Sequence, residues 1–170
     1  MKNNFRILIA FFAMLILAGS NANAQKIGYV DLQELMQLMP EYKKANTDME
    51  AFGKSLEDEL KKMSDEFQKK VADYQKGEKT MPEAIRNVKQ QELQDMQTRI
   101  QDFQQSAQEN IRKKEAELLK PIIEKAKSAI GQVAKETGYT YIMDSSVAGF
   151  LYKPEETNVL AAVKKKLGIL

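Results

Sequence analysis

Large apolar residues recur with a helical period along most of the chain. Between positions 35 and 74 nearly every step is three, four or seven residues, through Leu35, Tyr42, Met49, Phe52, Leu56, Leu60, Met63, Phe67, Val71 and Tyr74. This is the spacing of a coiled-coil seam. Gly77 and Pro82 break the pattern, and a second series follows through Ile85, Val88, Leu93, Met96, Ile100, Phe103, Ala107, Ile111, Leu118, Ile122 and Ala126. The pattern predicts two long helices joined by a connection near residues 77–82.

The two series mirror each other across this connection. Facing positions, from Tyr74 with Ile85 to Tyr42 with Leu118, add up to 159 or 160, and half of that sum falls near position 80. The mirror predicts a long antiparallel helical hairpin over residues 35–137. With a rise of ~1.5 Å per residue, an arm of about forty residues is roughly 60 Å long.

Two positions should weaken the hairpin near its root. Ala45 would face Lys114 or Glu115, so we expect the seam to be loose or bent there. Pro121 lies within the second helix and should kink it or interrupt its hydrogen bonds.

Short strands are expected on both sides of the hairpin. "KIGYV" precedes it, within a body strand and helix start at 25–34, and "YTYIMD" (139–144) and "FLYK" (150–153) follow it, within a body segment at 138–170. A short helix within "EETNVLAAVKKKLGIL" closes the chain, with Thr157 or Asn158 near its start. The expected fold class is therefore mostly α with a small β body, the hairpin being inserted between the strands.

So small a body should associate with copies of itself. Three strands and one helix bury little apolar surface, and the chain has no cysteine to form a disulfide. Open strand edges would pair between copies, and closing a small oligomeric β-barrel would remove those edges. The strand residues expected in this oligomer body are Ile27, Tyr29, Tyr139, Tyr141, Ile142, Phe150 and Tyr152.

The first 24 residues read as a signal peptide. A basic start, the apolar run "ILIAFFAMLILA" and the small-x-small site "ANA" predict cleavage after Ala24, and hence export to the periplasm. A membrane anchor is the alternative, but the apolar run is shorter than the ~20 residues that span a bilayer. Beyond this segment, 24 basic residues balance 24 acidic ones, which argues against a nucleic-acid binder.

Composition also argues against an enzyme and against a cofactor. The chain contains no His, Cys or Trp, so the commonest general base, the thiol nucleophile and the usual zinc, copper and haem ligands are absent. No nucleotide-binding or nucleophile-elbow motif is present. Asp31 and Asp144 lie beside strands, where we expect solvent exposure or turn hydrogen bonds rather than a carboxylate pair.

The chain after residue 24 resembles the Skp/OmpH family of periplasmic chaperones. The resemblance rests on "KIGYVDLQELMQLMPEYKKA", the charged hairpin, "GYTYIMDSS" and the terminal helix. It implies a homotrimer whose strands form a central barrel and whose three helical tentacles enclose a cavity. It also implies an ATP-independent holdase that binds unfolded outer-membrane proteins there and prevents their aggregation. The alternative function is a structural or adaptor hairpin of the cell envelope that is not a chaperone.

Two groups of residues are candidates for contact with partners. Met36, Met39 and Met81 lie off the apolar seam, and flexible methionines suit varied unfolded partners, although Met81 could simply cap the turn. Around the connection lies a basic tip, which could meet anionic lipid headgroups or acidic client segments, or could be an ordinary solvated helix face. Its residues are Lys69, Lys70, Lys76, Lys79, Arg86 and Lys89.

Overall fold

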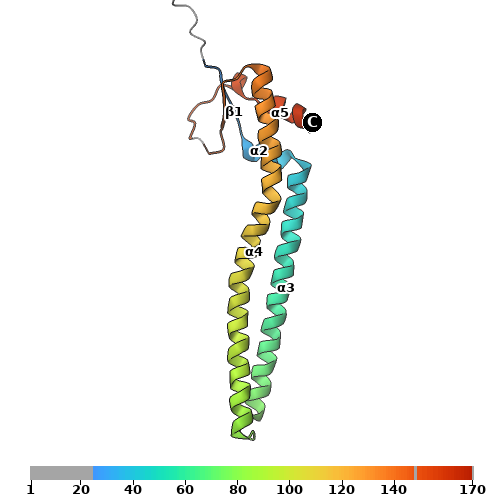
Figure 1. The fold of residues 1–170 in the computed structure, drawn as a ribbon, viewed down its shortest axis with the longest axis vertical. Coiled ribbons are helices and arrows are strands. Elements are labelled where there is room, and N and C mark those ends of the chain that lie inside the picture. Colours follow the sequence, from blue (N-terminus) through green and yellow to red (C-terminus); the bar gives the residue numbers. More distant parts are fainter. Residues whose placement is uncertain (1–24, 148, 170) are drawn as a thin grey trace, which may run out of the picture.

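The computed structural model describes residues 25–147 and 149–169. The predicted signal peptide lies outside the described residues. The chain forms β1 (Ile27–Val30), α2 (Leu32–Leu38), α3 (Pro40–Gly77), α4 (Glu83–Thr137), β2 (Tyr141–Asp144), the 3₁₀ turn η1 (Glu155–Thr157) and α5 (Leu160–Leu167). Figure 1 shows α3 and α4 side by side as a long arm, with the remaining elements gathered at one end. A mostly helical fold with a small sheet is confirmed.

The helix expected to begin at Leu35 is divided in two before the arm. Asp31 caps α2 by accepting a hydrogen bond from the Glu34 amide at 2.9 Å. Met39 is extended, with φ −75° and ψ 130°, because the residue before a proline disfavours the helical region. Pro40 then begins α3, where its missing N–H costs nothing. This break lets the chain change direction between body and arm.

The return from α4 to the sheet is fixed by a left-handed glycine. Gly138 has φ 72°, a conformation that glycine adopts without strain, and the Tyr139 amide donates to the Ala134 carbonyl at 3.0 Å. Lys26 donates from Nζ to the carbonyl of Thr137 at 2.9 Å and lies 4.2 Å from the centre of the Tyr139 ring. The lysine before β1 therefore caps the last turn of the helix that precedes β2.

The sheet is a parallel pair of strands joined through the whole arm. Ile27 pairs with Tyr141 and Val30 with Asp144. On its other side β1 forms a single bridge to Asn158, and the Val159 amide donates to the Tyr29 carbonyl at 2.9 Å. Both edges of β1 are thus occupied within the chain.

The predicted third strand at 150–153 is wrong for the single chain. Phe150 and Tyr152 lie in irregular structure, and Tyr139 lies before β2 rather than within it. Among the described residues no strand lies beside this segment, and a strand is not stable without a partner.

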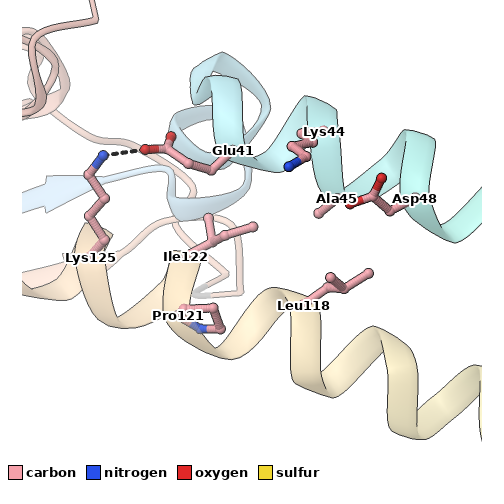
Figure 2. A pocket seen from close by; sticks show the side chains of 8 residues that line it. All are labelled: Glu41, Lys44, Ala45, Asp48, Leu118, Pro121, Ile122 and Lys125. Carbon is pink, nitrogen blue, oxygen red and sulfur yellow. Dashed lines mark hydrogen bonds and ion pairs between the residues drawn. The ribbon is translucent and has the colours of Figure 1, made fainter.

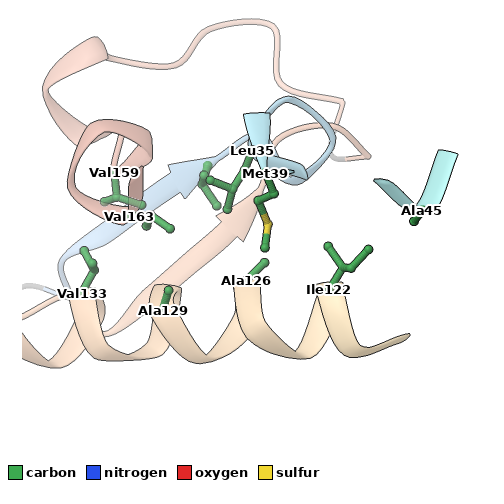
Figure 3. Close-up of a cluster of buried hydrophobic side chains, with 10 residues drawn as sticks. Leu35, Met39, Ala45, Ile122, Ala126, Ala129, Val133, Val159 and Val163 are labelled. Atoms are coloured by element: carbon green, nitrogen blue, oxygen red, sulfur yellow. The ribbon is translucent and has the colours of Figure 1, made fainter. Parts of the chain in front are cut away.

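One small hydrophobic core lies where the sheet, α2, α5 and the last turns of α4 meet. Figure 3 shows Leu35, Met39, Val159 and Val163 packed over Ala126 and Ala129 of α4. Alanine at these α4 positions allows the other elements to approach the helix closely. Among the described residues, no helix is long and apolar enough to cross a membrane.

Candidate functional site

The outer face of the sheet exposes apolar side chains. Val30 and Ile142 pack against the core, whereas Ile27, Tyr141 and Met143 are exposed, Tyr141 at 55%. The outer edge of β2 has no strand beside it among the described residues. This edge and face have the character of a surface that another strand could cover.

Residues 145–147 and 149–154, which follow β2, add to this apolar surface. They display Val147, Phe150, Leu151 and Tyr152 to solvent, and Leu151 is fully exposed. The Nζ of Lys153 donates to the Ser145 hydroxyl at 3.1 Å and lies 4.7 Å from the centre of the Tyr29 ring. Lys153 therefore joins the end of this segment to its start and to β1.

The three methionines proposed to contact partners are not freely exposed. Met39 is completely buried and points toward Ala126, because the break before Pro40 turns it into the core (Figure 3). That candidate contact is wrong for the folded body. Met36 is partly buried against the same core, and Met81 lies over the backbone of Gly77 at the end of α3.

The two helices of the arm pair about one turn away from the predicted register. Lys70 forms an ion pair with Glu92, and Gln90 donates from Nε2 to the Tyr74 hydroxyl at 2.8 Å. The position numbers of these pairs add up to 162 and 164, not to 159 or 160. The predicted pairing at the tip is therefore wrong, and these polar contacts flank the seam there.

This register leaves two predicted seam residues on the surface. Ile85 is 48% exposed and Val88 66% exposed, while Arg86 and Lys89 are partly buried. The residues expected in the middle of the α3 seam, from Met49 to Tyr74, are all partly buried. The apolar seam is thus present along α3, but α4 enters it only from Leu93 onward.

Charges near the tip are partly paired. The Lys70 ammonium bonds to the Glu92 carboxylate, which raises the pKa of Lys70 and lowers that of Glu92. Lys69, Lys76 and Lys79 remain exposed. The six predicted basic residues therefore do not act as one free cationic surface.

Several hollows lie along the described part of the arm, and two of them are lined by both helices. The first, of about 600 Å³, lies near the tip and is lined by Glu66, Lys70, Val88, Gln91, Glu92, Asp95, Met96 and Arg99. The second, of about 310 Å³, lies at the root and is lined by Glu41, Lys44, Ala45, Asp48, Leu118, Pro121, Ile122 and Lys125.

The root hollow lies where α3 presents the small side chain of Ala45 to α4. Figure 2 shows Leu118 and Ile122 pointing from α4 toward Ala45, with Lys125 paired to Glu41 across the opening. Ala45 therefore meets apolar side chains, and the expectation that it faces Lys114 or Glu115 is wrong because of the register shift. Its small methyl leaves the space unfilled, and α4 continues as helix through Pro121.

The described residues hold no group of three or more His, Cys, Asp or Glu side chains placed to bind a metal ion. Like Asp31, Asp144 accepts hydrogen bonds from backbone amides. Its Oδ1 accepts from the amides of Leu32 at 3.2 Å and Ser146 at 2.9 Å. Both carboxylates thus anchor backbone at the start of α2 or the end of β2.

Comparison with known proteins supplies the family. The family model described as outer membrane protein (OmpH-like) matches residues 26–167. A crystal structure from Caulobacter crescentus CB15, proposed to be an OmpH-like outer membrane chaperone, superposes with a TM-score of 0.73 at 13% identity, covering 86% of each chain. At this identity the likeness concerns the fold. No curated protein matches the chain.

Proposed function

We propose that this chain, which belongs to the family of OmpH-like outer membrane proteins, is an ATP-independent holdase chaperone for unfolded outer-membrane proteins. The observation that carries the proposal is the arm itself. Helices of 38 and 55 residues extend from a small body and pack only on each other for most of their length. Such an arm offers a long surface to an unfolded chain and needs no catalytic residue.

The proposal requires several copies, because one arm cannot enclose a client. The exposed outer face of the sheet, the outer edge of β2 and the apolar residues at 147 and 150–152 supply the surface for this association. Pairing of 150–153 with a neighbouring copy would give that segment the strand partner it lacks, and a closed barrel would remove the open edges. A homotrimer with its arms around a common space is the assembly we propose.

Holding a client would then work by mass action. An outer-membrane protein in transit exposes alternating apolar residues and unpaired strand groups, which promote aggregation. Binding lowers the free concentration of that species. Cleavage of the predicted signal peptide would place the protein in the periplasm, where such clients pass. A contact of the exposed tip lysines with an anionic membrane is a further, separate proposal.

Light scattering tests the function directly. The protein lacking residues 1–24 is mixed with a urea-unfolded outer-membrane barrel protein and diluted into buffer. A soluble species that contains several copies and one client supports the holdase. Precipitation of the client while the protein elutes alone contradicts it, and the envelope-adaptor function would then be the better proposal.

A further inference from the structure

The outer part of the arm carries an apolar surface that its own partner helix does not cover. Ile85 and Val88 lie one turn apart on α4, and both are about half exposed or more. They are uncovered because Lys70–Glu92 and Tyr74–Gln90 set the register of the tip. Val88 lines a groove, and Ile85 lies one turn before it on the same helix.

That groove, the tip groove, continues from Val88 toward Arg99. Its apolar part is formed by Val88 and by Met96, which is almost buried. Its charged part contains three carboxylates, Glu66, Glu92 and Asp95, against two cations. Because Lys70 neutralises Glu92, the remaining groups are two carboxylates and Arg99, so the groove favours a cation.

We propose that the tip groove, with Ile85, binds a segment of unfolded client that combines an apolar side chain with a Lys or Arg. The apolar side chain lies on Val88 and Met96, and the cation lies beside Glu66 and Asp95. This proposed binding site rests on the proposed holdase function. It adds where on the arm the client binds and which charge the client segment carries. The partner is thus an extended cationic–apolar peptide segment.

Charge distinguishes this partner from other occupants of the same surface. Inside the groove an anionic headgroup would lie against Glu66 and Asp95, which would repel it. The exposed Lys69, Lys76 and Lys79 are not part of the groove lining. A symmetric contact between two tip grooves would bring two surfaces of net negative charge together. An extended peptide with a basic residue avoids both conflicts.

The first experiment locates the client. Since the chain has no cysteine, Val88→Cys can carry a single photo-crosslinker, and Ile111→Cys, at an α4 residue 36% exposed and outside the groove, is the matched control. We expect the unfolded client to crosslink mainly from position 88. Equal yields from both positions, or arm-to-arm products as the main species, would overturn the proposal while leaving client holding itself intact.

The second experiment measures preference with two synthetic peptides of alternating Val and Ser, one with two Lys and the other with two Glu. Ile85→Ser together with Val88→Ser should weaken binding of the Lys peptide about tenfold, and Ile111→Ser should change it by less than about twofold. Glu66→Lys with Asp95→Lys should reverse a preference of about fivefold for the Lys peptide. Equal affinity of the unmodified protein for both peptides refutes the charge preference, and failure to hold any client in light scattering refutes the function instead.

Discussion

Replacing Asp144 should separate the end of β2 from the start of α2. Its Oδ1 accepts three hydrogen bonds, from the Leu32 amide at 3.2 Å, the Ser146 amide at 2.9 Å and the Ser146 hydroxyl at 2.7 Å. The Leu32 amide is the first of α2 and has no partner within its own helix. Asp144→Ala removes all three hydrogen bonds at once.

The expected loss of unfolding free energy is about 1–3 kcal/mol. A hydrogen bond to a charged group contributes about 1.5–3 kcal/mol when it is shielded from water, and less when water can replace it. The Leu32 bond is partly buried, whereas both Ser146 bonds are exposed. In a chain of this size each kcal/mol lowers the melting temperature by roughly 2–4 °C. Ser146→Ala, which keeps the Leu32 contact, should cost less than about 1 kcal/mol.

The pH dependence has a definite sign. Burial raises the pKa of Asp144, but the hydrogen bonds from Ser146 and from the Leu32 amide outweigh this and hold it below its ordinary value. A carboxylate with a lowered folded pKa stabilises the protein above its unfolded pKa of about 3.9. This stabilisation is lost as the pH falls through the folded pKa. The difference between the natural protein and Asp144→Asn should therefore be constant from pH 5 to pH 7 and shrink below about pH 4.

Urea unfolding at pH 7 and pH 3 measures the free energies, and hydrogen exchange at the Leu32 amide reports the local contact. We expect faster exchange of this amide in Asp144→Ala. The reasoning is refuted if Asp144→Ala lies within 0.5 kcal/mol of the natural protein, about the scatter of surface substitutions. It is also refuted if the effect of Asp144→Asn is the same at both pH values.

Three further substitutions test the body and the root of the arm. A Cβ at Gly28 would lie 2.9 Å from the Tyr139 ring and 3.2 Å from the Thr157 carbonyl, so Gly28→Ala should cost about 1–3 kcal/mol in urea unfolding, and an unchanged midpoint would contradict this contact. Leu35→Ala should cost about 2–5 kcal/mol because Leu35 is completely buried, and calorimetry should show a melting temperature lowered accordingly. Ala45→Leu should add about 1 kcal/mol by filling part of the 310 Å³ root hollow, and a destabilised arm in thermal unfolding by circular dichroism would show that the hollow cannot accept it.

The hairpin was predictable because its signal is local and long. Two apolar series with a helical period and a break at Gly77 and Pro82 suffice to predict two helices that pack together. Their register was not predictable from the same signal. A seam that repeats every three or four residues can be aligned almost equally well after a shift of one turn. Lys70, Glu92 and the Tyr74–Gln90 contact select among these alignments, and a count of apolar residues omits them.

The errors in the body have a different origin. Residues 150–153 have the composition of a strand, but a strand forms only where it pairs with another, and in the single chain this segment does not pair with the open edge of β2. Met39 was placed on the surface because its position in the helical period was read across Pro40. The proline ends that period, and the methionine enters the core. The client contacts that we propose are therefore Ile85 and Val88, which are exposed, and not the buried Met39.

The pairing of β1 with β2 has a consequence for the order of folding. Ile27 and Tyr141 are 114 positions apart, so closing this contact in an open coil would cost considerable loop entropy and slow the search. The arm reduces that cost, because α3 and α4 can zip from the tip through contacts between near neighbours and bring their two ends together. Before α4 has formed as far as Thr137, β1 lacks its partner strand β2. Pairing of the two arm helices therefore brings the two strands of the body together. Substitutions at the tip that slow this pairing should also delay formation of the body, although the body lies at the opposite end of the arm.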